Sequence, residues 1–286
     1  MNHLSSLLDP LRQVKQHWQL AQKERLEIAP ADVLFCSFPK SGRTWLRHIL
    51  GNLLKDSFGL PANTSFLEVE NLPSLHPGIP KIMFLHDDEP FWKTPDELRL
   101  KKNLYRQKKV ILMVRHPADV IVSGYFEKTR RYVVHGSQKP AFEGSITDYV
   151  SSRHGSTDTL IRYLNIWAEE SSRFPHFCLL RYEDLHENAF RQVKQIVEFL
   201  GIEAFASDAA IETAIANSSF ENMREMERRD AFASFRLRPG DLSDPESFKT
   251  RKGKVGGYLD YLDKASMTYI ADKINRELSG IYGYTM

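Results

Sequence analysis

The stretch FCSFPKSGRTWLRHIL, from Phe35 to Leu50, joins an apolar run to an amphipathic run through a short polar turn. The apolar residues before Pro39 are typical of a buried strand, and those after Thr44 recur at helical spacing. Such a turn presents backbone N–H groups at the positive end of a helix, where a phosphate-like anion can bind. Lys40 precedes the glycine, so the turn lacks the G-K-[ST] order of a nucleotide P-loop.

The turn offers several groups to an anion. Gly42 permits close approach of the backbone, and Lys40 adds a mobile positive charge. Ser41 and Thr44 add hydroxyl donors, and Arg43 completes the cradle. The alternative is a capped helix after an ordinary polar turn, because serine and glycine are common turn residues.

The alternation of strand and helix continues along the chain. KKVILMVRHP (108–117) predicts a buried strand, and Pro117 suits the first turn of the helix that follows. PKIMFLHD (80–87) and HFCLLRYEDL (176–185) predict two more strands, and helical patterns occupy 158–174 and 188–201. We therefore predict an α/β fold with a central parallel sheet and helices on both faces.

The remaining segments complete a single predicted domain over 1–286. An amphipathic N-terminal helical segment is expected within 1–30, and the catalytic α/β core within 31–286. Two further helices are expected at 207–228 and 262–279. Irregular segments are expected at 57–80, 129–145 and 230–256, and the second of these is interpreted as a surface loop or lid.

Composition excludes several classes of function. The 39 basic and 37 acidic residues give a net charge of +2, which disfavours bulk binding of nucleic acid. The longest apolar run, Val110 to Val114, is far too short to span a membrane, and a soluble cytoplasmic protein is expected. Cys36 and Cys178 are interpreted as buried reduced thiols. Motifs of dinucleotide, hydrolase and zinc sites are missing from the sequence, which leaves anion transfer without a metal.

Three separated strings together resemble the signature of the cytosolic-type sulfotransferases. They are FPKSGRTW (38–45), VRHPADVIVSGYF (114–126) and RKGKVGG (251–257). The resemblance runs from about Asp32 to the last predicted helix and implies a P-loop-like sulfotransferase domain. Enzymes of that family use 3′-phosphoadenosine 5′-phosphosulfate (PAPS) as sulfuryl donor and release adenosine 3′,5′-bisphosphate (PAP).

The resemblance implies a donor site. Lys40 and the turn 41–44 would hold the 5′-phosphosulfate, and the 3′-phosphate would be held by Arg115, Ser123, Arg251, Lys252 and Gly253. The position of Arg115 agrees, because ligands of open α/β sheets bind at the carboxyl ends of the strands. The adenine would lie against Trp45, Phe220, Tyr182 and Ser218.

The resemblance also implies the catalytic groups. His86, at the end of a predicted strand, matches the family's base, and an imidazole titrates near neutral pH. Lys40 would meet the charge that grows on the leaving phosphate. Ser123 would hold Lys40 away from the donor until the acceptor arrives.

The sequence departs from the family pattern at several positions. Phe84 stands where many animal members carry a lysine, and Arg43 is the candidate to replace that charge. Gly257 follows the RKG string where the family has aspartate. The family's dimer motif is only half present, at Lys264 and Thr268, so both a monomer and a homodimer remain open.

The acceptor is expected to be a small molecule bearing a hydroxyl or an amine. HDDE (86–89) places three carboxylates beside the proposed base, which favours a cationic acceptor, although helix capping by Asp87 or Asp88 is an equal alternative. A P-loop-like kinase that uses ATP and magnesium is the second hypothesis for function. A non-catalytic protein that binds adenosine bisphosphate is the third.

Overall fold

The computed structural model describes residues 24–132 and 140–286. The predicted helix within 1–30 therefore lies almost wholly outside the described residues. Only its last turn, at 24–28, is seen as helix.

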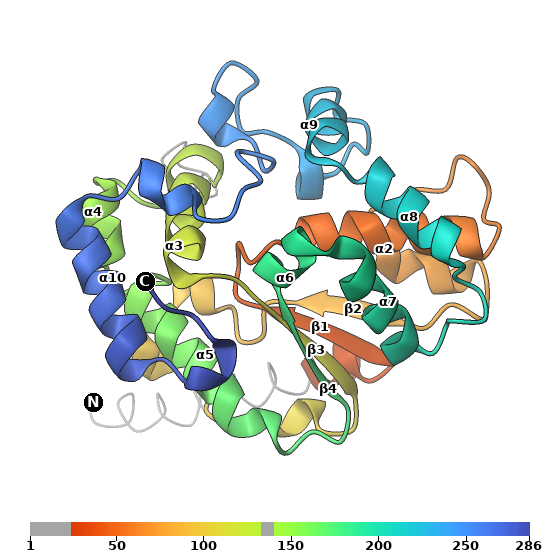
Figure 1. Cartoon of the computed structure of the whole chain (residues 1–286), viewed down its shortest axis with the longest axis horizontal. Coiled ribbons are helices and arrows are strands. Elements are labelled where there is room, and N and C mark those ends of the chain that lie inside the picture. The colour runs from red at the N-terminus through yellow and green to blue at the C-terminus, as the bar shows by residue number, and fades with distance from the viewer. Residues whose placement is uncertain (1–23, 133–139) are drawn as a thin grey trace, which may run out of the picture.

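The sheet has four strands in the order β2-β1-β3-β4, and all neighbours are parallel. The strands are β1 (Val33–Ser37), β2 (Ile82–Leu85), β3 (Lys109–Val114) and β4 (Phe177–Arg181). β1 lies in the middle, so Phe35 pairs with Phe84 of β2 on one side and with Ile111 of β3 on the other. The predicted parallel sheet is confirmed, and the carboxyl ends of its strands meet at one edge (Figure 1).

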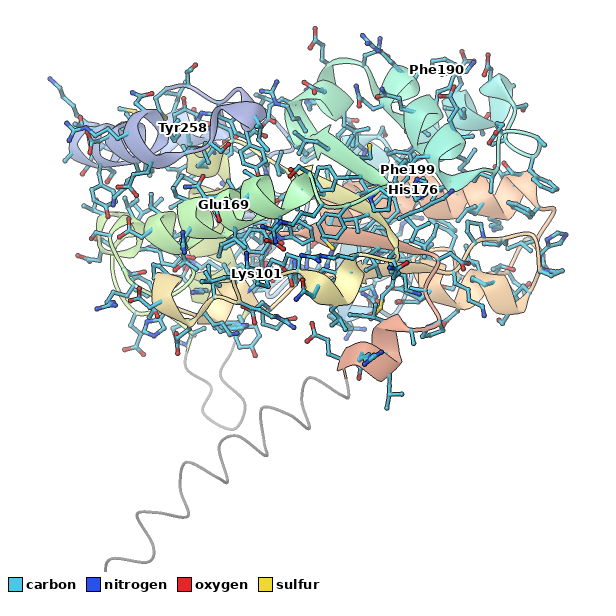
Figure 2. The ribbon with its side chains drawn as sticks, turned by 90° about the horizontal axis from the view of Figure 1, so that it is seen from below. Lys101, Glu169, His176, Phe190, Phe199 and Tyr258 are labelled. Atoms are coloured by element: carbon cyan, nitrogen blue, oxygen red, sulfur yellow. The ribbon has the colours of Figure 1, made fainter. Side chains whose placement is uncertain are left out.

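Helices cover both faces of this sheet. Successive residues of a strand point to opposite faces, so each strand contributes side chains to two core clusters. Leu34 and Cys36 face one core cluster, formed with α3 (Pro117–Phe126), α5 (Thr157–Ser171) and α10 (Lys264–Glu277). Val33 and Phe35 face a second cluster, formed with α2 (Arg43–Ser57), α7 (Ala189–Leu200) and α8 (Asp208–Asn217). In Figure 2, Glu169 marks α5 and Phe199 marks the end of α7. The two sets of helices make the single α/β domain.

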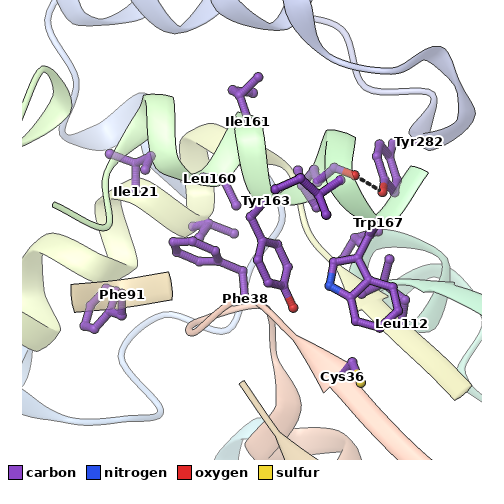
Figure 3. Close-up of a cluster of buried hydrophobic side chains, with 14 of the residues drawn as sticks. Cys36, Phe38, Phe91, Leu112, Ile121, Leu160, Ile161, Tyr163, Trp167 and Tyr282 are labelled. Atoms are coloured by element: carbon purple, nitrogen blue, oxygen red, sulfur yellow. Dashed lines mark hydrogen bonds between the residues drawn. The ribbon is translucent and has the colours of Figure 1, made fainter. Parts of the chain in front are cut away.

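The first cluster is rich in aromatic rings (Figure 3). Trp167 is fully buried in it, and Phe38 meets Tyr163 edge to face with ring centroids 5.5 Å apart. The hydroxyl of Tyr282 donates to the carbonyl of Leu164 at 2.6 Å, which ties the last residues of the chain to α5. This cluster fixes the segment after β1, from which the polar turn begins.

Three segment predictions need correction. The helix expected at 207–228 is two helices, α8 and α9 (Phe220–Arg228), because the Ser219 side chain caps α9 and breaks the first helix. The loop expected from 129 begins later, since α3 continues as a π-helical turn, Glu127–Arg131. Within the polar segment 230–256 lie two short 3₁₀ helices, Phe235–Leu237 and Pro245–Ser247.

The remaining elements are short. The α-helices are α4 (Ile146–Val150) and α6 (Tyr182–Glu187), and the other 3₁₀ helices are Val69–Ser74, Pro90–Trp92, Pro95–Glu97, Asn103–Tyr105, Gly257–Asp260 and Gly280–Tyr282. Within the described ranges, none of the helices has the length and apolar character that crossing a membrane requires. Both cysteines are free thiols, Cys36 buried and Cys178 partly buried, and desolvation raises the pKa of each.

Candidate active site

A cavity of about 950 Å³ opens at the carboxyl edge of the sheet. Its lining includes every candidate site residue from the sequence except Ser41: Lys40, Gly42, Arg43, Thr44, Trp45, His86, Arg115, Ser123, Tyr182, Ser218, Phe220, Arg251, Lys252 and Gly253. The first and last of these residues, Lys40 and Gly253, lie more than 200 positions apart in the chain. The fold therefore brings the three strings around one space.

The turn after β1 has an unusual backbone. Lys40 and Gly42 both have positive φ, 75° and 99°. A Cβ at Gly42 would lie 2.4 Å from Cδ2 of Tyr182, so only glycine fits there. Ser41 is buried, and its hydroxyl donates to the carbonyl of Phe38 at 2.9 Å. This hydroxyl is used within the turn, and its expected contact with a bound anion stays a prediction.

Lys40 is held by a carboxylate that we did not predict. Its Nζ lies 2.5 Å from Oε2 of Glu127, and the same oxygen lies 3.2 Å from Nε of Arg131. The other oxygen of this carboxylate, Oε1, lies 3.9 Å from Nζ of Lys249. Burial opposes ionisation of Glu127, but Lys40, Lys249 and Arg131 together lower its pKa. Burial lowers the pKa of Lys40, and Glu127 opposes that shift.

The partner expected for Lys40 was Ser123. No hydrogen bond joins Ser123 to Lys40 in the part of the chain that the structure describes. Glu127 lies four residues after Ser123, about one helical turn, and therefore faces the same cavity. That spacing was the signal in the sequence that would have revealed it.

His86 directly follows β2 and lines the cavity. Its Nδ1 lies 3.0 Å from the carbonyl oxygen of Ser37, and its Nε2 lies 2.6 Å from Nη2 of Arg43. Desolvation first, and then the charge of Arg43, lower the pKa of His86 well below its ordinary value. The imidazole is therefore neutral near pH 7.

Arg115 follows β3, as the sequence predicts. Its Nη2 donates to the carbonyl of Lys254 at 3.0 Å and lies 3.4 Å from Oδ2 of Asp119. Its guanidinium carbon lies 4.3 Å from the ring centroid of Tyr182. The Nε donor is buried and has no acceptor among the described residues. A buried donor of this kind fits an anionic ligand.

The RKGK segment is fixed against α3. Asp119 accepts hydrogen bonds from the backbone N–H groups of Gly256 and Tyr258, both at 3.0 Å. Gly253 has a φ of 62°, and a Cβ there would lie 2.4 Å from the ring of Phe220. Two cations of the segment form ion pairs: Arg251 with Glu246 at 3.1 Å, and Lys252 with Asp260 at 2.7 Å.

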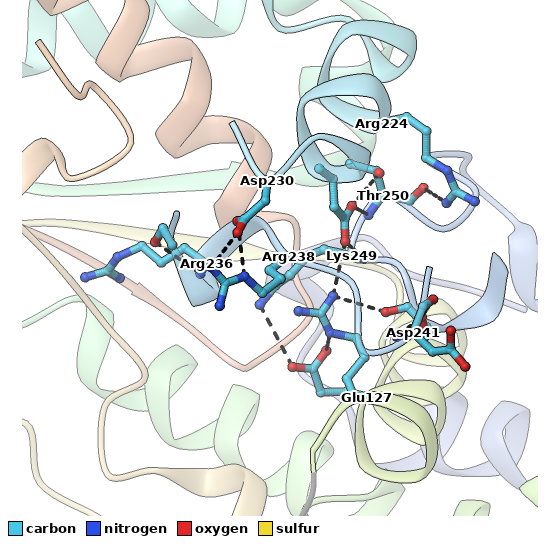
Figure 4. Close-up of polar contacts among 12 residues, drawn as sticks. Glu127, Arg224, Asp230, Arg236, Arg238, Asp241, Lys249 and Thr250 are labelled. Atoms are coloured by element: carbon cyan, nitrogen blue, oxygen red, sulfur yellow. Dashed lines mark hydrogen bonds and ion pairs between the residues drawn. The ribbon is translucent and has the colours of Figure 1, made fainter. Parts of the chain in front are cut away.

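A second unpredicted carboxylate, Glu227 of α9, anchors the residues just before this segment. It is fully buried and accepts from the backbone N–H groups of Lys249 and Thr250 at 2.6 and 2.9 Å. It also accepts from the Thr250 hydroxyl at 2.6 Å. Figure 4 shows Lys249 beside Glu127. Lys249 lines the cavity, and desolvation together with nearby cations lowers its pKa to about 7.

The aromatic candidates form one wall. Trp45 meets Tyr182 edge to face at 5.7 Å, and its Nε1 donates to the carbonyl of Ser218 at 3.0 Å. The Ser218 hydroxyl is already used, because it donates to the carbonyl of Ala214 and lies 2.7 Å from Nδ1 of His48. Ser218 lines the cavity, and the role at the adenine that the family's threonine implies for it stays a prediction.

The carboxylates after His86 point in different directions. Asp87 is buried, 2.6 Å from Nζ of Lys102, and accepts from the hydroxyl of Tyr105 at 2.7 Å. Asp88 pairs with Lys93. Only Glu89 of the three lines the cavity, and burial raises its pKa. The argument for a cationic acceptor therefore loses two of its three carboxylates.

Cations outnumber carboxylates in the lining. Arg43 forms no ion pair with a described carboxylate, and its Nη1 is a buried donor without an acceptor among the described residues. Burial, Arg47 and Arg236 lower its pKa. Across the ranges 24–132 and 140–286 we find no cluster of three histidine, cysteine or acidic side chains able to hold a metal ion. The site suits an anionic ligand.

Comparison with known proteins defines the class. Residues 30–282 match the model of the sulfotransferase domain family. Because this match spans most of the chain, the chain belongs to the sulfotransferase family. The resemblance seen in the sequence is confirmed, and so is the enzyme class, a sulfotransferase.

Similar proteins from animals and plants are also sulfotransferases. The chain is 30% identical over 213 residues to sulfotransferase 1A1 of Bos taurus, covering 72% of this chain and 70% of the relative. It is 26% identical to sulfotransferase 1A1 of Mus musculus, covering 84% and 81%. It is 24% identical to cytosolic sulfotransferase 17 of Arabidopsis thaliana, covering 95% and 84%.

Solved structures confirm the fold. The crystal structure of mouse sulfotransferase SULT7A1 complexed with PAP superposes with a TM-score of 0.55 at 20% identity, covering 86% of this chain and 84% of that chain. Retinol dehydratase in complex with androsterone and PAP gives a TM-score of 0.54 at 16% identity, covering 88% and 84%.

Proposed function

We propose that this sulfotransferase moves the sulfuryl group of PAPS to a hydroxyl or amine of a small-molecule acceptor. The observation that carries the proposal is the single cavity around Lys40, His86, Arg115 and Arg251. Its cations and buried, unpaired guanidinium donors fit the phosphates and sulfonate of PAPS. The PAP complexes of two structural neighbours support the same donor.

The donor would be held from both ends. Lys40 and the turn from Ser41 to Thr44 would bind the 5′-phosphosulfate. Arg115, with its free Nε, would bind the 3′-phosphate. Other contacts would come from the following residues: Ser123, Arg251, Lys252 and Gly253 at the 3′-phosphate, and Trp45, Tyr182, Ser218 and Phe220 at the adenine.

His86 would act as the general base. When bound, PAPS supplies an activated sulfuryl group with a phosphate as leaving group. The Nδ1 proton of His86 is directed at the Ser37 carbonyl, so Nε2 carries the lone pair, and His86 lines the cavity. A neutral imidazole can take the acceptor's proton there, and Lys40 would stabilise the charge on the departing phosphate. No metal is required for these steps.

The acceptor would enter between Glu89, Trp92 and Tyr132, which line the cavity. Glu89 stands three residues after His86, and the rings of Trp92 and Tyr132 are in contact, with centroids 4.6 Å apart. Retinol and androsterone occur in complexes of structural neighbours, which supports a small organic acceptor. A cationic acceptor remains a hypothesis that rests on Glu89 alone. A cytoplasmic location, supported by the cytosolic relative, and a monomer or homodimer complete the proposal.

Calorimetry in EDTA tests the donor class. We expect tight binding of PAP, much weaker binding of AMP and ATP, and loss of PAP binding in Arg115→Ala. Arg115 would hold the 3′-phosphate of PAP. Removing Arg115 from the protein or the 3′-phosphate from the nucleotide should therefore weaken binding to a similar degree. Binding that needs ATP and magnesium would instead indicate the kinase. PAP binding without any turnover in an acceptor screen would indicate the non-catalytic protein.

A further inference from the structure

The proposed base is blocked in this structure. A carbonyl oxygen only accepts hydrogen bonds, so the 3.0 Å contact with Ser37 places a proton on Nδ1 of His86. The lone pair is then on Nε2, and Nη2 of Arg43 donates to it at 2.6 Å. An acceptor hydroxyl needs the same lone pair in order to transfer its proton. Arg43 and the acceptor therefore compete for one atom.

Arg43 has no anionic partner within the described ranges. The two neighbouring guanidinium groups do: Arg47 pairs with Glu70, and Arg236 with Glu68. Arg43 is also the first residue of α2, directly after the turn at Lys40. An anion held at that turn would lie within reach of its second, unpaired nitrogen, Nη1.

For the guanidinium of Arg43, the neutral imidazole of His86 is a weaker partner than an anion. The negative charge of an oxyanion attracts the guanidinium in addition to the hydrogen bond, and a planar guanidinium binds oxyanions through two parallel bonds. A sulfonate next to Arg43 would therefore draw the guanidinium away from Nε2. Acceptor deprotonation becomes possible only after that exchange.

We propose that Arg43 is a positioning residue with two partners, holding Nε2 of His86 before the donor binds and the sulfuryl oxygens of PAPS afterwards. This inference rests on the proposed function. It makes PAPS binding the event that exposes the base, and it prevents the acceptor from binding productively without a donor. Arg43 would thereby also supply the positive charge that Phe84 cannot.

The chemical step balances with these groups alone. The acceptor's O–H proton moves to Nε2 of His86, and the acceptor oxygen forms a bond to sulfur. The bond between sulfur and the 5′-phosphate oxygen breaks, and its electron pair stays on that oxygen, which gives PAP. The charged groups that face His86 are Arg43 of α2, Lys40 of the turn and Lys249 of the segment before RKG. Glu89 lines the same cavity.

The test is an NMR titration of the imidazole in the whole protein, with labelled histidine and His86→Gln to assign the signal. The His86 pKa is measured in free protein, with PAP, and with PAPS in the absence of acceptor. We expect PAPS to raise the pKa by about one unit more than PAP, a tenfold change in proton affinity. PAP lacks the sulfuryl group, so its 5′-phosphate at the turn would meet Nη1 of Arg43 alone, and Nη2 should stay on Nε2 of His86.

Two variants separate the role of Arg43 from a general charge effect. In Arg43→Gln, the His86 pKa should rise in the free protein, and the difference between PAPS and PAP should fall by at least half. Arg238→Gln is the matched control, because Arg238 lines the same cavity but pairs with Asp230. It should leave the difference unchanged. If Arg43→Gln does not fold, Arg43→Lys, which lacks the planar fork, should reduce the PAPS-dependent change in the Nε2 ¹⁵N shift.

The outcomes are distinct. An equal difference between PAPS and PAP in wild type and Arg43→Gln would overturn the exchange of partners. An unchanged His86 pKa in free Arg43→Gln would overturn the contact itself. Failure of the wild type to bind either nucleotide would contradict the proposed function instead.

Discussion

The two walls of the cavity are built in different ways. The strand-end wall consists of the turn 40–44, His86 and Arg115, which follow β1, β2 and β3. The C-terminal wall consists of residues 249–257, which follow no strand and are held by buried carboxylates, Glu227 and Asp119. Sheet topology places the first wall, whereas long-range hydrogen bonds place the second. A change in Glu227 should therefore disturb the C-terminal wall first, whereas Asp119 also lies 3.4 Å from Arg115 of the strand-end wall.

The largest effect is expected on the strand-end wall, from Lys40→Met. Removing a cation that stabilises the transition state should lower kcat by about 10²- to 10³-fold. Because the backbone N–H groups of the turn remain, PAP affinity should fall far less than kcat. Initial rates with PAPS and calorimetry with PAP measure the two quantities.

Lys194→Met is the control, since Lys194 lies on the surface of α7 and pairs with Asp208. It should change neither rate nor affinity. A Lys40→Met enzyme whose kcat stays within a few-fold of wild type would show that the strand-end wall does not carry the chemistry.

The strand-end wall was accessible from the sequence because its pattern is local. Apolar runs followed by helical spacing predict strand, turn and helix without knowledge of distant contacts. Lys40, His86 and Arg115 each end such a run, and parallel strands bring their ends to one edge. The N-terminal helix of the prediction lies outside the described residues and stays a prediction.

A smaller effect is expected from Glu227→Gln, which acts on the C-terminal wall. The amide keeps the shape but can no longer accept with two charged oxygens from Lys249 and Thr250. PAP affinity should fall about tenfold, or about 1.4 kcal/mol. The free energy of unfolding should fall by about 1–3 kcal/mol. Calorimetry and urea denaturation measure the two changes.

Glu225→Gln on the same helix is its control, because Glu225 pairs only with Arg228 and Arg229 among the described residues. Both measurements should match wild type there. Wild-type PAP affinity in Glu227→Gln would mean that the position of the C-terminal wall does not depend on this carboxylate.

The C-terminal wall was beyond sequence reasoning for a physical reason. Glu227 accepts from the backbone N–H groups of Lys249 and Thr250 across 22 and 23 positions, and no local pattern distinguishes it from an exposed helix carboxylate. The expectation that all three carboxylates of HDDE lie beside the base was wrong for a related reason. Asp88 and Glu89 both have positive φ, 69° and 47°, so the backbone turns and sends neighbouring side chains in different directions. Only Glu89 then lines the cavity.

A third expected effect is a dependence of PAP affinity on pH, which Lys249 would cause at the junction of the two walls. The pKa of Lys249 is lowered to about 7, so at pH 8 its amine is mostly neutral in the free protein. A bound anion raises that pKa, so PAP binding takes up a proton, and affinity falls as the pH rises above 7. Between pH 7 and 8 the fall should reach about fivefold at most.

Calorimetry at pH 8, repeated in buffers of different ionisation enthalpy, measures how many protons the protein takes up when PAP binds. We expect nearly one proton in wild type and close to none in Lys249→Met. Equal proton uptake in both proteins would assign the titrating group to another residue and remove Lys249 from contact with the ligand.

The smallest effect is expected at the acceptor entrance, where Glu89 and Asp88 provide a matched pair. Asp88 is bound to Lys93 and to the backbone N–H of Arg99, so its charge is already compensated. Asp88→Asn should leave the ratio of KM values for amine-bearing and neutral acceptors unchanged. Glu89 forms no ion pair with a described residue, and Glu89→Gln should raise that ratio by about two- to fivefold if the acceptor is cationic, the size of a partly exposed ion pair. A ratio that Glu89→Gln leaves unchanged would end the case for a cationic acceptor, since no other carboxylate of HDDE lines the cavity.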